Sequence, residues 1–131
     1  MILYYEQHGQ GPDVVLVHGW AQHGGIWTDV ARALSAEFRV TVPDLPGHGR
    51  SRDFLPRAFT ADALAEEVRR VLPGPATWVG WSLGGFVALA AVQSPTMHQD
   101  HVGSVTMTFI KNRHTPFTAE SASSNRSTCA S

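Results

Sequence analysis

A serine flanked by glycines is the residue whose type and spacing most directly suggest chemistry. Residues 80–84 read G-W-S-L-G, which is the pattern G-x-S-x-G with Ser82 at its centre. They lie between a short run typical of a strand (77–79) and a run of small apolar residues typical of a helix (86–93). A serine on such a strand-to-helix turn holds its hydroxyl above a sheet, where it can attack a carbonyl carbon. Because the chain passes close to itself at this turn, Gly80 and Gly84 are predicted to be elbow glycines.

The predicted helix begins directly after Ser82, so the positive end of its dipole lies beside the serine. The N-terminal helix dipole and the free backbone N–H of Leu83 would face negative charge that develops on a substrate. The sequence therefore favours Ser82 as a nucleophile. The alternative is a plain strand–glycine–helix connection of an α/β protein, because G-x-S-x-G also occurs by chance.

A nucleophilic serine needs a base within hydrogen-bonding reach, so the histidines are the next candidates. His98 and His101 follow the predicted helix, whose far end lies roughly 16 Å from Ser82 at a rise of 1.5 Å per residue. That distance excludes both as the base. His18 and His48 lie on the same rim as Ser82, but we expect each to shape its own loop. These four histidines therefore offer no clear base for Ser82.

The residues around the serine predict the sheet that must position it. The expected elements alternate along the chain, at 14–17 (strand), 26–34 (helix), 38–42 (strand), 61–71 (helix) and 102–110 (strand). Strands that are apolar throughout are typical of a parallel sheet covered on both faces. The predicted fold class is therefore α/β, a three-layer α/β/α sandwich with a mostly parallel sheet. Ligands bind beyond the carboxyl ends of such strands, where three glycine-containing loops are expected to converge.

Several other residues have structural interpretations. Thr60 is expected to cap the helix over 61–71. Asp44 ends a strand on the active rim, and we expect its carboxylate to close a turn by accepting backbone N–H bonds. Trp78 and Phe86 are expected in the core.

The composition of the chain limits the classes of protein to which it can belong. The chain has 131 residues, 43% of them hydrophobic and 16% charged, which fits one small globular domain. A net charge of −1 gives no indication of nucleic acid or an anionic membrane as partner. The single cysteine, Cys129, excludes an internal disulfide and a cysteine-rich metal site. No apolar run approaches the roughly 18 residues of a membrane span, and the N-terminus does not resemble a secretory signal. A cytoplasmic protein is therefore expected.

Three motifs on this framework resemble the α/β-hydrolase superfamily. They are V-H-G-W (17–20), D-L-P-G-H-G-R-S (44–51) and G-W-S-L-G-G (80–85). Within the superfamily they resemble the pimeloyl-[acyl-carrier protein] methyl ester esterases of biotin synthesis, over roughly residues 2–109. The resemblance implies a carboxylesterase that needs no metal or organic cofactor. Its expected partner is an ester substrate carried on acyl-carrier protein.

The resemblance also implies roles for individual residues. Ser82 matches the nucleophile, and the backbone N–H groups of Trp20 and Leu83 match the oxyanion hole. The indole rings of Trp20 and Trp81 would line the substrate site. Another serine hydrolase of the same fold, such as a lactonase or a thioesterase, is the alternative activity.

The sequence departs from the superfamily after the last predicted strand. In that superfamily the catalytic acid and histidine follow the serine far downstream, and members are much longer than this chain. His114 is the one later histidine near the correct rim, in a segment with no reason to be ordered. We therefore expect an α/β-hydrolase fold truncated after the strand that follows the elbow helix, with negligible activity as the alternative function.

The composition divides the chain into two parts. Residues 1–110 are predicted to form the N-terminal part of an α/β-hydrolase domain. Residues 111–131 are rich in serine and threonine, show no family resemblance, and are expected to be disordered. An unpaired strand edge at 102–110 would make the fragment prone to self-association, whereas a full-length relative is expected to be a monomer.

Overall fold

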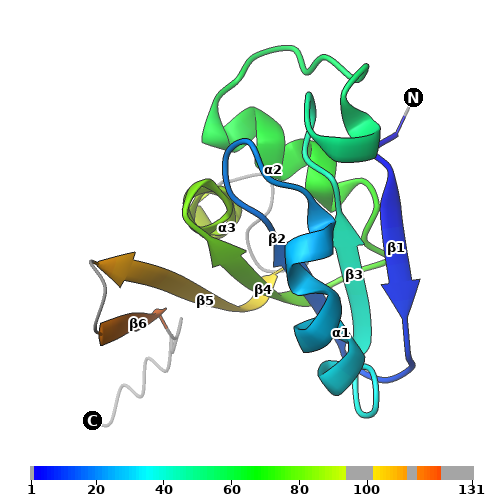
Figure 1. Ribbon diagram of the computed structural model, residues 1–131, viewed down its shortest axis with the longest axis vertical. Helices are drawn as coiled ribbons and strands as arrows, with labels where there is room; N and C mark the ends of the chain where they lie inside the picture. The colour runs from blue at the N-terminus through cyan, green and yellow to red at the C-terminus, as the bar shows by residue number, and fades with distance from the viewer. Residues whose placement is uncertain (1, 94–101, 112–114, 122–131) are drawn as a thin grey trace, which may run out of the picture.

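One mixed sheet carries the part of the chain that the computed structural model describes, which is residues 2–93, 102–111 and 115–121. Its strands are β1 (Tyr5–His8), β2 (Asp13–Val17), β3 (Arg39–Pro43), β4 (Ala76–Trp81), β5 (Val102–Lys111) and β6 (Thr115–Ser121). Their order across the sheet is β1-β3-β2-β4-β5-β6. The four inner strands are parallel, and β1 and β6 pair antiparallel at the two edges (Figure 1). The predicted mostly parallel sheet is thus confirmed.

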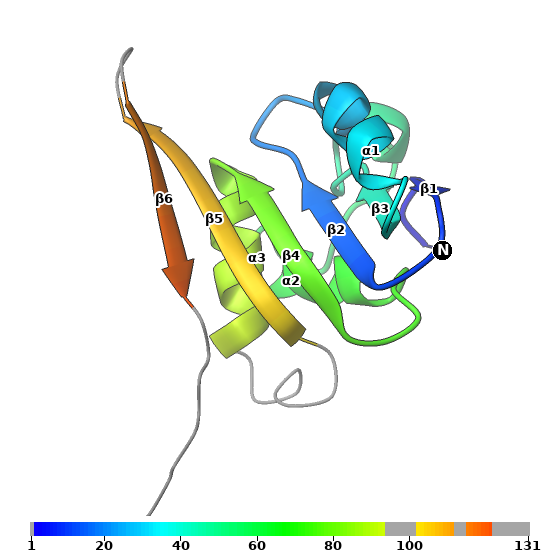
Figure 2. The ribbon, with the colours of Figure 1, turned by 90° about the horizontal axis from the view of Figure 1, so that it is seen from below.

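Helices cover both faces of this sheet. They are α1 (Thr28–Leu34), α2 (Ala61–Arg69) and α3 (Leu83–Gln93), with short 3-10 helices at η1 (Gly24–Trp27) and η2 (Gly49–Ser51). The helix α1 lies on one face, and α2 and α3 lie on the other (Figure 1, Figure 2). This is the predicted three-layer sandwich. Among the described residues, no helix has the length and apolarity to cross a membrane.

The helix α2 forms where the sequence predicts it. The Thr60 hydroxyl accepts the backbone N–H of Ala63 at 3.2 Å, which satisfies one of the free N–H groups of the first turn. Leu64, Ala65 and Val68 are buried on one face of the helix. That spacing of three and four residues gives α2 the apolar stripe that packs on the sheet.

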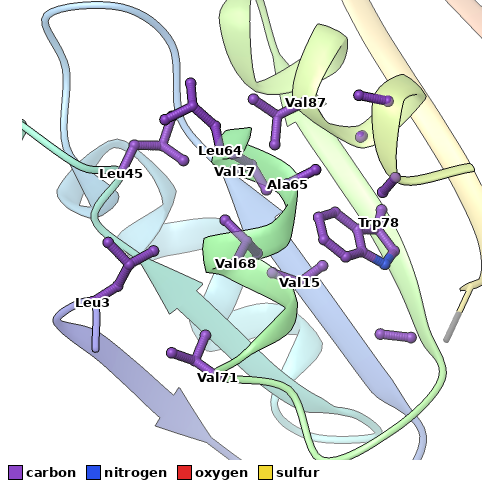
Figure 3. Packing of buried hydrophobic residues seen from close by; sticks show 14 residues of the cluster. Leu3, Val15, Val17, Leu45, Leu64, Ala65, Val68, Val71, Trp78 and Val87 are labelled. Carbon is purple, nitrogen blue, oxygen red and sulfur yellow. The ribbon is translucent and has the colours of Figure 1, made fainter. Parts of the chain in front are cut away.

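The larger of two cores lies between the sheet and the pair α2 and α3. Figure 3 shows the side chains of Trp78, Val15 and Val68 close together between β4, β2 and α2. Trp78 is fully buried, as predicted. The smaller core, on the α1 face, contains Val14, Leu16, Ala31, Val40 and Val42. Because β2 contributes side chains to both cores, it is the central strand that a continuous apolar run predicts.

The segment after β5 differs from the sequence prediction. The predicted strand at 102–110 is confirmed as β5, but residues 115–121 form β6 instead of disordered chain. Phe109 pairs with Phe117, and Thr106 pairs with Glu120. An edge strand offers unpaired N–H and C=O groups, and a short connection lets the following residues return and bind them. Threonine in this segment also favours a strand.

The pairing of β6 removes the unpaired β5 edge that the sequence suggested. The expected self-association rested on that edge and loses this basis. The rest of the tail, 112–114 and 122–131, lies outside the described residues, as do His98, His101 and His114. The domain boundary after residue 110 stays a prediction.

Candidate active site

Ser82 joins β4 to α3 in a strained conformation. Its φ angle is +54°, in the left-handed region that residues with a Cβ rarely adopt. Such a conformation costs on the order of 1–3 kcal/mol and persists only where the surrounding structure enforces it. The Ser82 carbonyl accepts the N–H of Gly85 at 2.9 Å, which starts the helix. The Ser82 side chain is exposed, so the turn presents the hydroxyl to solvent.

The surrounding structure that enforces this turn is a close approach of three backbone segments. A Cβ built on Gly80 would collide with the backbone of Gly84 and Gly85. A Cβ built on Gly84 would collide with the carbonyl oxygens of Val17 and His18 at the end of β2. Neither Gly80 nor Gly84 has room for a side chain, so the first turn of α3 rests directly on β2.

The loop after β2 lies beside the serine. A Cβ built on Gly19 would lie 3.2 Å from the Cβ of Ser82 and 3.0 Å from Cδ1 of Trp81. Among the described residues, no hydrogen bond uses the backbone N–H of Trp20 or of Leu83. Of the two N–H groups named by the sequence, that of Trp20 lies in the loop after β2 and that of Leu83 lies at the start of α3.

The two tryptophans of the site differ in exposure. The Trp20 side chain is 66% exposed, and its ring meets the His48 ring edge-on with 5.1 Å between centroids. Trp81 is half-buried. The serine faces open surface between these loops. A hollow of about 240 Å³ lies elsewhere, between β1 and α1, and Ser82 does not border it.

His18 is buried and uses both ring nitrogens. The Leu45 N–H donates to Nε2 at 3.0 Å, so Nε2 carries no proton. The proton is therefore on Nδ1, which donates to the Gly19 carbonyl at 2.7 Å. Burial, the largest effect, lowers the pKa of His18 from its usual 6.5, and the hydrogen bond to Gly19 opposes this only in part. His18 is thus a neutral structural residue, as predicted, and is not available as a base for Ser82.

Asp44 and His48 hold the loop after β3. The Asp44 carboxylate accepts the N–H of Gly24 at 2.6 Å through Oδ1 and the N–H of Arg50 at 2.9 Å through Oδ2. This confirms the predicted closure of the turn by Asp44. The Nδ1 of His48 lies 2.9 Å from the carbonyl of Pro46. Both side chains are therefore engaged in fixing loops.

Sequence reasoning missed two residues and misplaced a third. The Gln22 side chain accepts the Gly19 N–H at 3.0 Å. Ala21 has a φ angle of +60°, the second strained residue beside the site. Phe86, expected in the core, is 55% exposed, because the core face of α3 is filled by smaller residues. Gln22 follows the H-G-W motif closely, but nothing in its residue type signals a contact with Gly19.

The described residues contain no group of three or more His, Cys, Asp and Glu side chains arranged to hold a metal ion.

Known proteins share both sequence and fold with this chain. Residues 14–119 match the family model described as "Alpha/beta hydrolase family". The chain is 48% identical over 93 residues to the pimeloyl-[acyl-carrier protein] methyl ester esterase of Methylococcus capsulatus, covering 71% of this chain and 36% of that protein. It is 53% identical over 88 residues to the same-named esterase of Chromobacterium violaceum, covering 67% and 34%.

Two solved structures have a similar fold. Est816, described as an N-acyl homoserine lactone degrading enzyme, has a TM-score of 0.73 at 28% identity, covering 81% of this chain and 41% of that one. A thermophilic esterase from Thermogutta terrifontis has a TM-score of 0.61 at 38% identity, covering 67% and 34%. The chain spans between 34% and 44% of the length of the curated relatives it matches.

The close approach at the elbow predicts that added methyl groups destabilise the fold. Gly80→Ala and Gly84→Ala should each lower the free energy of unfolding by about 1–3 kcal/mol, because the new Cβ overlaps backbone that cannot easily move. Gly74→Ala is the matched control, since nothing lies within 4 Å of its added Cβ. It should change stability by no more than about 0.5 kcal/mol. Urea unfolding followed by circular dichroism measures all three, and equal effects would contradict the close approach.

The buried state of His18 predicts a pH dependence of stability. Because its folded pKa is lowered, the unfolded chain binds the proton more tightly, and stability falls as pH drops below about 6.5. Between pH 7.5 and 5.5 the parent chain should lose up to about 1.4 kcal/mol more than His18→Gln. Gln10→Asn, at an exposed residue that does not titrate, should follow the parent. Denaturant unfolding at the two pH values tests this, and parallel losses in the parent and His18→Gln would refute it.

Proposed function

We propose that this chain, which belongs to the alpha/beta hydrolase family, carries the nucleophile and oxyanion hole of a serine carboxylesterase. The observation that carries the proposal is the strained, exposed Ser82 at a strand-to-helix turn. The loop of Gly19 lies against it. Within the described residues, positive φ at a residue other than glycine occurs at Ala21 and Ser82, and such strain is typical of a functional site.

The proposed reaction proceeds through an acyl-enzyme. The Oγ of Ser82 attacks the ester carbonyl carbon and gives up its proton to a base. The carbonyl oxygen becomes an oxyanion, which accepts hydrogen bonds from the N–H groups of Trp20 and Leu83. The carbon–oxygen bond to the alcohol then breaks, and the alcohol leaves with the proton. Water attacks the acyl group on Ser82 and releases the carboxylic acid.

The proposed oxyanion hole stabilises the negative charge that develops on the carbonyl oxygen in the transition state. Each donor of such a hole lowers the barrier by about 3–4 kcal/mol in a rigid site. Support comes from the free N–H groups of Trp20 and Leu83 and from the helix that begins at Leu83, whose dipole favours negative charge. His18 is excluded as the base, because both of its ring nitrogens are engaged in hydrogen bonds within the loops.

The proposed substrate is the methyl ester of an acyl chain bound to a carrier protein. Its support is that several relatives, 40–53% identical to this segment, are pimeloyl-[acyl-carrier protein] methyl ester esterases. The exposed ring of Trp20 and the half-buried ring of Trp81 would line the acyl site. A lactone is the second candidate, favoured by the similarity in fold to a lactone-degrading enzyme. Both substrates are esters and pass through the same tetrahedral oxyanion.

Ser82 should react with a fluorophosphonate, an electrophile that traps nucleophilic serines. The serine oxygen replaces fluoride at phosphorus, and the hydroxyl proton passes to base or solvent. Mass spectrometry should find one phosphonyl group per chain, on the peptide that contains Ser82. Ser82→Ala should remain unlabelled. Ser35→Ala is the matched control, because that hydroxyl is bound to the Arg32 carbonyl at the end of α1, and it should label like the parent.

The outcomes separate the candidate functions. Equal labelling of the parent and Ser82→Ala would refute the proposed nucleophile. Hydrolysis of a p-nitrophenyl ester is then compared for the same two chains. If Ser82 is labelled but the two rates of hydrolysis match, the chain carries the nucleophile without turnover, which is the alternative of an incomplete catalyst. Where Ser82-dependent turnover exists, rates with monomethyl pimelate and with a lactone distinguish the two substrates.

A further inference from the structure

We propose that Gln22 is a positioning residue that sets the direction of the Trp20 N–H in the oxyanion hole. This inference rests on the proposed function, because it concerns the same site. Gln22 is assigned no contact with the substrate. Its effect would pass through Gly19, which is hydrogen-bonded to the Gln22 side chain and lies beside Ser82.

Gln22 binds both polar groups of Gly19. Its side-chain Oε1 accepts the Gly19 N–H at 3.0 Å. Its backbone N–H donates to the Gly19 carbonyl at 3.2 Å. The same carbonyl also accepts the Nδ1–H of His18 at 2.7 Å. Gly19 is buried, so these bonds are made where water competes little and where an unsatisfied N–H would be costly.

These bonds determine where the Trp20 N–H points. The Gly19 carbonyl and the Trp20 N–H belong to one peptide unit, which is planar and trans. In such a unit the C=O and the N–H point in opposite directions. The two donors that hold the Gly19 oxygen therefore fix the Trp20 N–H on the opposite side. The Gln22 side chain fixes the preceding peptide unit, so both planes that flank Gly19 are held.

Gln22 also selects which N–H remains free. Gly19 and Trp20 offer consecutive N–H groups at this loop, and Gln22 engages only the first. The bond from the Gln22 N–H to the Gly19 carbonyl closes a four-residue turn in which Ala21 has positive φ. That position of a turn favours glycine, and alanine is strained there. The two hydrogen bonds of Gln22 help to hold this strained turn closed.

The Gln22 side-chain oxygen and the Cβ of Ser82 both lie close to Gly19. A Cβ built on Gly19 would lie 2.7 Å from the Oε1 of Gln22 and 3.2 Å from the Cβ of Ser82. A small rotation of this peptide would thus turn the Trp20 N–H away from an oxyanion formed at Ser82. Misplacement of a catalytic group by about 1 Å can lower a rate by about 100-fold.

The test compares Gln22→Met with Gln10→Met. Methionine is similar in length to glutamine and lacks a strong acceptor, and Gln10 is exposed in the turn between β1 and β2. Reaction of Ser82 with a fluorophosphonate builds negative charge on the phosphoryl oxygen, which uses the same N–H groups. Gln22→Met should lower the maximal labelling rate about tenfold, since the N–H is misdirected and not removed. The concentration of probe at half-maximal rate should change by less than about twofold, because ground-state binding is unaffected.

A second measurement follows the hydrogen bond itself. In Gln22→Met the amide proton of Gly19 should exchange with solvent at least about tenfold faster than in the parent, because it loses its acceptor. Gln10→Met should change neither readout. An unchanged maximal labelling rate in Gln22→Met would overturn the positioning role. If the parent itself is not labelled at Ser82, the proposed function fails, and unchanged Gly19 exchange would then overturn the proposal for Gln22 independently.

Discussion

The contact on which the site depends is the backbone packing of α3 against the end of β2. Gly84 lies so close to the carbonyl oxygens of Val17 and His18 that no side chain fits between them. Helix α3 must therefore start at that point, directly after β4, and the single residue left to turn the chain is Ser82 with its positive φ. The strain at Ser82 is offset by the burial of β2, β4 and α3 in one core. Packing of the whole sheet thereby holds one hydroxyl in an exposed, fixed position.

Hydrogen bonds then arrange the three loops around that hydroxyl. His18 joins the loop after β2 to the loop after β3 through the Leu45 N–H and the Gly19 carbonyl. Asp44 joins the loop after β3 to the start of η1 through the Gly24 N–H. These bonds satisfy the Gly19 carbonyl, the Leu45 N–H and the Gly24 N–H within the loops themselves. A site built in this way is organised before a substrate arrives, which is the property that makes such donors effective.

Much of this arrangement could be predicted from the sequence, because it depends on local patterns. The apolar run of β2 predicts a central strand, Thr60 predicts a helix start, and G-x-S-x-G predicts the elbow. The features that were missed depend on contacts made in three dimensions. Gln22 has no pattern that predicts a bond to Gly19. The strand β6 forms because β5 offers an edge, although its composition suggests disorder. In both cases a backbone N–H or C=O group forms a hydrogen bond with a residue that the sequence pattern does not identify.

The most direct test of the central claim is a crystal structure of the chain with an alkyl boronic acid, which mimics the tetrahedral intermediate. The account predicts a covalent bond from the Oγ of Ser82 to boron. It also predicts one boronate oxygen about 2.7–3.1 Å from the backbone nitrogens of Trp20 and Leu83. An adduct whose oxygens all face solvent, or boron bound to another residue while Ser82 stays free, would contradict it.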